Sequence, residues 1–79
     1  MEVLTNLKPG ELAKVTGIYG GRGARHNLSL RGIQEGDIIR MVSSSGGPVV
    51  VEVNRSIIAL GRGIARRIIT QRINKRESA

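Results

Sequence analysis

Residues 20–36 have the sequence GGRGARHNLSLRGIQEG, in which glycines frame the one segment that is predicted to be helical. From Ala24 onward the spacing fits a helix, because Ala24 and Leu28 lie four residues apart and share one face. Gly32 is placed to end this helix, since glycine readily adopts the left-handed backbone of a helix terminus. Ile33 follows and can fold back onto the last turn. A helix of about two to three turns depends on packing against the rest of the chain.

On either side of this segment the sequence predicts short strands separated by tight turns. The predicted strands are residues 12–18, 38–42, 48–53, 56–60 and 66–73, and the turns between them are residues 8–11, 34–37, 43–47 and 54–55. Residues 1–7 are expected to be a lead-in and residues 61–65 a turn or a single helical turn. This pattern predicts a mainly β fold, a small closed or nearly closed five-stranded barrel with one short helix laid across it.

Alternation of apolar and polar residues indicates which side chains face the interior. In the first predicted strand Ala13 and Val15 point inward, and in the last one Ile68 and Thr70 share a face. The predicted core consists of Ala13, Val15, Leu28, Ile38, Val50, Ile58, Leu60 and Ile68.

The chain has 79 residues, which is enough for one domain with a small core. We expect that domain to span residues 1–73 and a polar C-terminal tail to span residues 74–79. There is no cysteine, which excludes disulfides and thiolate chemistry. The start of the chain does not resemble a signal peptide, and no apolar run approaches the length of about 20 residues that spans a bilayer. A cytoplasmic location is therefore expected.

The formal net charge is +7, from 13 Lys and Arg against 6 Asp and Glu, which predicts an acidic partner. The basic residues form two groups, Arg22, Arg25 and Arg31 around the helix and Arg62, Arg66, Arg67, Arg72, Lys75 and Arg76 near the C-terminus. Nucleic acid is disfavoured, because Tyr19 is the only aromatic residue and small-barrel RNA binders stack bases on aromatic rings. Sequence-independent phosphate binding stays open.

No constellation of side chains predicts catalysis. Gly21 and Gly23 follow a strand as in a dinucleotide-binding loop, but His26 occupies the position of the third glycine. His26 is the only histidine, and neither Glu35 nor Asp37 lies at a spacing that places two metal ligands on one helix face. We expect a non-enzyme, with no certain cofactor. A site for a transition metal ion such as iron stays an open alternative, without assigned ligands.

These residues resemble the FeoA family, the small cytoplasmic component of the bacterial and archaeal ferrous iron transport system. The resemblance extends from residue 7 to residue 69. It includes the opening turn LKPG at residues 7–10, VTGI at residues 15–18, GGRGAR at residues 20–25, GPVVVEV at residues 47–53 and IIALGRGIARRI at residues 57–68. The last stretch is the most specific. Leu30-Arg31 departs from the pattern, since many relatives have an acidic and then an apolar residue there.

The resemblance implies an SH3-like barrel, similar to the C-terminal domain of iron-dependent repressors. It implies partnership with FeoB, the membrane transporter with a cytoplasmic GTP-binding domain, and it implies no catalysis. Our hypothesis is a binding module that meets this transporter through Arg22, Arg25 and Arg31. The alternatives are a regulatory or nucleic-acid accessory domain, as in the repressors, and a metal sensor or carrier. A homo-oligomer is also compatible with the sequence.

Overall fold

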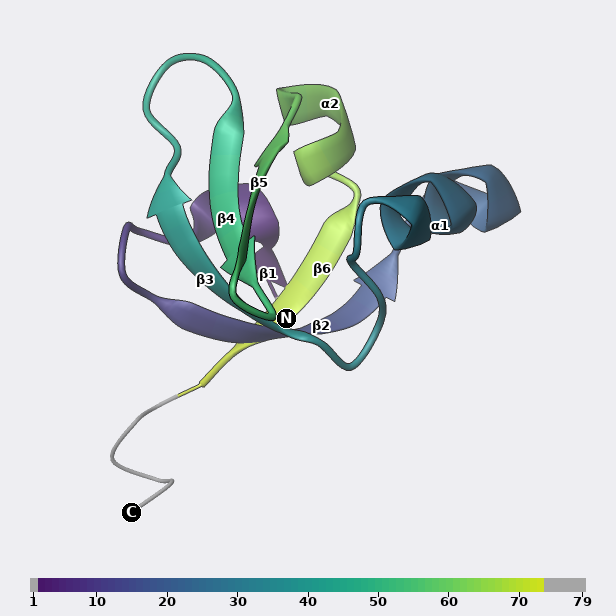
Figure 1. Cartoon of the computed structure of the whole chain (residues 1–79), viewed down its shortest axis with the longest axis horizontal. Helices are drawn as coiled ribbons and strands as arrows, with labels where there is room; N and C mark the ends of the chain where they lie inside the picture. The colour runs from purple at the N-terminus through teal and green to yellow at the C-terminus, as the bar shows by residue number, and fades with distance from the viewer. Residues whose placement is uncertain (1, 74–79) are drawn as a thin grey trace.

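The computed structural model describes residues 2–73, which form one antiparallel sheet of six strands (Figure 1). The strands follow one another in the sheet in the order β1-β6-β2-β3-β4-β5. In chain order the elements are β1 (Glu2–Val3), η1 (Leu4–Asn6), β2 (Leu12–Ile18), α1 (Gly21–Leu30), β3 (Ile38–Ser43), β4 (Val49–Val53), β5 (Ser56–Leu60), α2 (Arg62–Ala65) and β6 (Ile68–Arg72).

The mainly β class with one short helix is confirmed, with six strands in place of the five predicted. The additional strand is β1, which pairs with β6 through Glu2 and Val3 only. The sheet curves over its own core, and the hydrogen-bonded ladder described by residues 2–73 does not close, because β1 and β5 are its two edges. The predicted tail at residues 74–79, with Lys75 and Arg76, lies outside the described residues.

The sheet has two irregularities, and the one in β2 changes which side chains face the core. The register of β2 against β6 shifts between Val15 and Gly17, and that of β3 against β4 shifts between Met41 and Ser43. Such bulges increase the local bend and twist of a strand. The shift in β2 explains why Ile18 is buried together with Val15 although the two are three residues apart.

Of the eight residues predicted to form the core, five are confirmed and three are corrected. Five predicted residues are buried: Ala13, Val15, Leu28, Leu60 and Ile68. Ile38 is 46% exposed and its neighbour Ile39 is buried instead. Val50 is half-buried, because Val49, Val51 and Val53 occupy the inward face of β4. Ile58 is half-buried and packs against the core. In β3 and β4 apolar residues follow one another directly, so alternation does not indicate the inward face.

The helix α1 begins at Gly21, three residues before the predicted start, and ends where it was predicted to end. Gly32 has a φ of 95°, and its N–H donates to the Ser29 carbonyl while the Ile33 N–H donates to the Leu28 carbonyl. This is the Schellman arrangement, and it places Ile33 next to Leu28 in the core.

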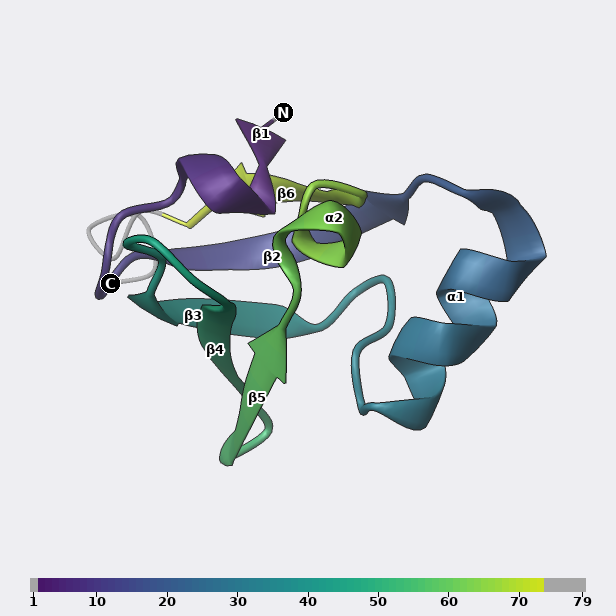
Figure 2. The ribbon, with the colours of Figure 1, turned by 90° about the horizontal axis from the view of Figure 1, so that it is seen from above.

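The position of α1 differs from the prediction, since the helix lies beside the sheet, beyond the end of β2, and not across it (Figure 2). Leu28 is its only buried residue, and Ala24 is partly buried against the core. A helix with so narrow an apolar stripe attaches at its edge and leaves most of its surface in solvent.

The turn between β4 and β5 contains Asn54 and Arg55, with φ angles of 51° and 68°. Two consecutive left-handed residues define the type I′ turn of a two-residue hairpin. Asparagine tolerates this backbone, whereas arginine adopts it at a cost. The hairpin therefore fixes the register of β5, in which Ser56 faces Val53.

Candidate docking surface

The three arginines predicted to bind a partner lie on or beside α1, but they do not share one face. Arg22 and Arg25 are exposed and, at about 100° per residue, are separated by about 60° around the helix axis. Arg31, nine residues after Arg22, caps the C-terminal end of the helix and lies on its opposite side. The structure therefore brings Arg22 and Arg25 together and separates Arg31 from them. Their role in binding stays a prediction.

Arg25 connects α1 to the loop before β3. Its guanidinium nitrogen Nη2 lies 3.6 Å from Oε2 of Glu35, and both side chains are largely exposed. An exposed ion pair of this length contributes between nothing and about 1 kcal/mol. Arg25 is therefore only weakly held and can exchange Glu35 for a carboxylate of a partner.

Arg31 faces the sheet at β5. Its Nη1 donates a long hydrogen bond of 3.4 Å to the carbonyl oxygen of Ala59. The nearby Gly32 also lies close to the side chain of Ile58. The C-terminal end of α1 thus lies alongside the edge strand of the sheet.

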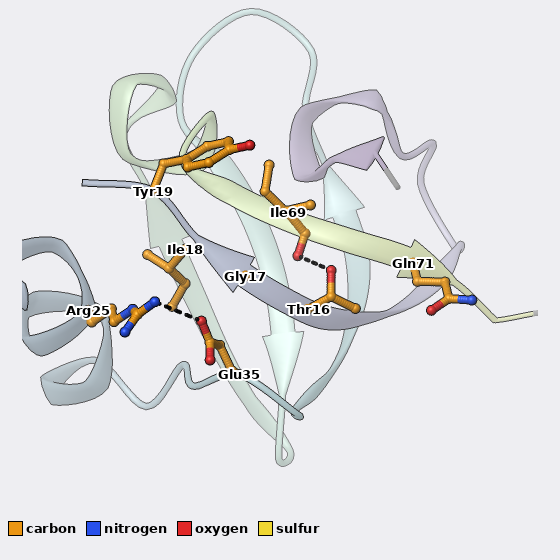
Figure 3. Close-up of a pocket in the computed structure, with 8 residues that line it drawn as sticks. All are labelled: Thr16, Gly17, Ile18, Tyr19, Arg25, Glu35, Ile69 and Gln71. Atoms are coloured by element: carbon orange, nitrogen blue, oxygen red, sulfur yellow. Dashed lines mark hydrogen bonds and ion pairs between the residues drawn. The ribbon is translucent and has the colours of Figure 1, made fainter. Parts of the chain in front are cut away.

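A groove with a volume of about 450 Å³ lies between α1 and the outer face of β2 and β6 (Figure 3). Its lining consists of Thr16, Gly17, Ile18, Tyr19, Arg25, Glu35, Ile69 and Gln71. Tyr19 is 68% exposed, and its ring lies on the β6 side of the groove near Ile69, opposite the Arg25–Glu35 pair. Sequence analysis did not assign Tyr19 to a site. Tyrosine and arginine are both enriched at protein interfaces.

The charges of the described residues are distributed unevenly. Of the five carboxylates in residues 2–73, Glu2, Glu11, Glu35 and Glu52 form ion pairs, and Asp37 accepts the N–H of Gln34. Basic side chains without an ion pair among the described residues are Lys8, Lys14, Arg22, Arg31, Arg55, Arg62, Arg66 and Arg67. Five of these eight residues lie in the two helices, at their C-terminal caps or in the β4–β5 turn: Arg22, Arg31, Arg55, Arg62 and Arg66. This uncompensated charge favours an acidic partner.

The described residues do not fit a metal centre of their own. Within residues 2–73 no group of three or more His, Asp or Glu side chains is close enough to hold a metal ion. His26 is exposed on α1, and Glu35 is paired with Arg25. No helix within residues 2–73 has the length and apolar character needed to cross a membrane.

Comparison with known proteins assigns the family. A model of the FeoA domain matches residues 3–72. A protein of Methanocaldococcus jannaschii named "Putative Fe(2+) transport protein A" is 35% identical over 71 residues, which are 90% of this chain and 87% of that protein.

Solved structures give the same result for the fold. The crystal structure of an iron uptake regulatory protein (FeoA) superposes with a TM-score of 0.83 at 31% identity, covering 90% of this chain and 95% of the other. FeoA of Stenotrophomonas maltophilia, described as an SH3 domain protein complexed with zinc, gives 0.75 at 23% identity and covers 90% and 91%.

The predicted similarity to iron-dependent repressors is also found. IdeR of T. acidophilum gives a TM-score of 0.82 at 27% identity, over 91% of this chain and 34% of that larger protein. The family model and the relative together cover nearly the whole described sheet, and the chain therefore belongs to the FeoA family.

Proposed function

We propose that this chain is a cytoplasmic, non-catalytic accessory protein of ferrous iron transport that docks on the cytoplasmic GTP-binding part of a FeoB-type transporter. Membership of the FeoA family supports the transport role. The docking surface consists of the exposed face of α1 with Arg22 and Arg25, together with the groove that Tyr19 lines. Arg31 belongs to the same end of the molecule but meets the partner from the opposite side of the helix.

The observation that carries this proposal is the exposure of α1. The helix buries Leu28 alone and carries no acidic residue in its first turn. Uncompensated arginines on an exposed helix repel one another and so lower the stability of a small domain, and an acidic partner that covers them removes this cost. A carboxylate-rich surface on the transporter would compensate Arg22 directly and Arg25 by exchange with Glu35.

A titration with the isolated GTP-binding part of the transporter tests the proposal, with calorimetry as the readout. The variant that combines Arg22→Gln and Arg25→Gln lowers the net charge by two. Lys8→Glu lowers it by the same amount in the turn before β2, at the end of that strand away from α1. We expect the double variant to bind about tenfold or more weakly, which corresponds to about 1.4 kcal/mol, and Lys8→Glu to bind nearly as the unaltered chain does.

Equal weakening by both variants would show that only total charge matters and would contradict the assigned surface. Unaltered binding by the double variant would contradict it as well. If the unaltered chain does not bind the GTP-binding part at all, the proposed partner is wrong.

The similarity to IdeR favours one second candidate, a regulatory or transition-metal-binding domain like those of iron-dependent repressors. This alternative predicts salt-sensitive binding to DNA in a mobility-shift experiment, since phosphate contacts weaken steeply as salt rises. It also predicts retention of ferrous, manganese or zinc ions in equilibrium dialysis, with loss on His26→Ala. Neither result is expected if docking on the transporter is the function.

A further inference from the structure

We infer that the free edge of β5 is a second contact, on which an extended acidic segment of the partner pairs as an additional strand. The inference deepens the proposed function and rests on it for the identity of the partner. It concerns β5 and Arg31, which the groove beside Tyr19 does not include.

The hairpin turn determines which backbone groups of β5 face outward. A two-residue hairpin closes with a hydrogen-bonded pair, here Val53 and Ser56, and bonded and non-bonded pairs then alternate along the strands. The N–H and C=O groups of Ser56, Ile58 and Leu60 therefore form hydrogen bonds with β4. Ile57 and Ala59 direct theirs toward the open edge.

The contact from Arg31 agrees with this assignment. The guanidinium donates to the carbonyl oxygen of Ala59. If the alternation were the reverse, this oxygen would accept a hydrogen bond from β4 instead. Among the described residues, the outward N–H groups of Ile57 and Ala59 donate no backbone hydrogen bond to a turn or loop, and the Ile57 carbonyl accepts none from one. An edge with unpaired groups of this kind is a template for a further strand.

The side chains along the edge determine the chemistry of the occupant. Ile57 is 61% exposed and offers apolar contact near the middle of the edge. Arg55 precedes the strand and Arg31 lies at Ala59, and neither has an ion pair among the described residues. These two positions span four residues of strand, or roughly 13 Å. A segment with an apolar centre and acidic ends fits this pattern.

A second copy of this chain fits the edge poorly. Two copies would bring Arg31 and Arg55 of each into proximity, and each chain has a net charge of +7. Charged side chains on an edge strand are a common means of preventing such self-pairing. Arg31 therefore has two roles. It repels the β5 edge of a second copy, and it attracts an acidic strand of the partner.

Residue-resolved amide hydrogen exchange tests the inference on the full chain, alone and with an excess of the transporter's GTP-binding part. We expect the amides of Ile57 and Ala59 to exchange quickly in the free chain and at least tenfold more slowly in the complex. The amides of Ile58 and Leu60 serve as internal controls, because their bonds to β4 protect them in both states.

Two variants at one exposed position give an independent readout. Ile57→Glu and Ile57→Lys both remove the apolar contact, but only the glutamate repels an acidic strand. We expect at least tenfold weaker binding for Ile57→Glu than for Ile57→Lys, with similar unfolding midpoints.

Binding without slower exchange at Ile57 and Ala59 would overturn the edge contact and leave the proposed function intact. Absence of any binding by the unaltered chain would overturn both. Protection of these amides that grows with the concentration of the chain alone would assign the edge to a second copy, which also overturns the inference.

Discussion

Arginine and glutamate side chains lie at both ends of β2, but they form close ion pairs only at its start. At its start, Arg72 of β6 lies 2.7 Å from Glu2 and 2.9 Å from Glu11, and also donates to the Asn6 carbonyl. At its end, Arg22 on α1 has no ion pair among the described residues, and Arg25 has one long one. Seven residues of strand, roughly 23 Å, separate these ends.

This difference separates arginines that hold the fold from arginines that are available for binding. Arg72 connects β6, the N-terminal strand and the opening turn, which are far apart in sequence. Beside it, the buried Thr70 donates to the Glu2 carbonyl at 3.0 Å. The arginines on α1 hold few elements together, because Arg22 has no ion pair among the described residues and Arg25 has only the long one with Glu35. We therefore expect substitutions at the start of β2 to lower stability and leave binding unchanged. Substitutions on α1 should weaken binding and leave stability nearly unchanged.

The largest effect is expected from Leu28→Ala, which removes the one buried anchor of α1. Truncation of a buried leucine costs about 2–5 kcal/mol, and we expect about 3 kcal/mol here, measured by urea unfolding. Leu30→Ala is the control, because that side chain is 74% exposed and should change stability by less than about 0.5 kcal/mol. Equal effects of the two substitutions would show that α1 is not held as the structure indicates.

A smaller effect is expected from Arg72→Ala, which removes the ion pairs with the half-buried Glu2 and Glu11 at the start of β2. We expect a loss of about 1 kcal/mol that decreases as salt is added, with unchanged binding to the transporter's GTP-binding part. Arg22→Ala should show the reverse, weaker binding with stability within about 0.5 kcal/mol of the original. If Arg22→Ala destabilised the fold more than Arg72→Ala, the contrast between the two ends would be wrong.

Arg55→Gly in the β4–β5 turn is expected to give a small gain in stability. Glycine adopts the φ of 68° without the cost that a side chain imposes, so we expect about 0.5–1 kcal/mol of stabilisation. The same substitution removes a charge from the edge of β5, so binding should weaken. A gain in both properties would argue against the edge contact.

Several features of the fold could be predicted because their signals are local. Gly32 after an apolar helix stripe indicates the end of α1, and the polar pair at residues 54–55 between β-branched segments indicates a hairpin. Thr70 was assigned correctly to the face of Ile68, because residues around it alternate. The family resemblance depends on short motifs of the same local kind.

Other features could not be predicted, since they depend on pairing between distant residues. β1 has two residues and exists only because it pairs with Thr70 and Ile69. The inward faces of β3 and β4 are set by packing against the other strands, because apolar residues follow one another directly in both segments and give no alternation to follow. The groove with Tyr19 forms only when β6 and α1 lie on either side of β2, so a sequence pattern does not indicate it.

Site-specific photo-crosslinking in cells that contain the transporter tests whether α1 contacts its GTP-binding part. A photoreactive amino acid replaces His26, exposed on α1, or Lys8, exposed in the turn at the other end of β2. We expect a crosslink from position 26 to the cytoplasmic GTP-binding part of the transporter and none from position 8. A crosslink from position 8 without one from position 26 would contradict it.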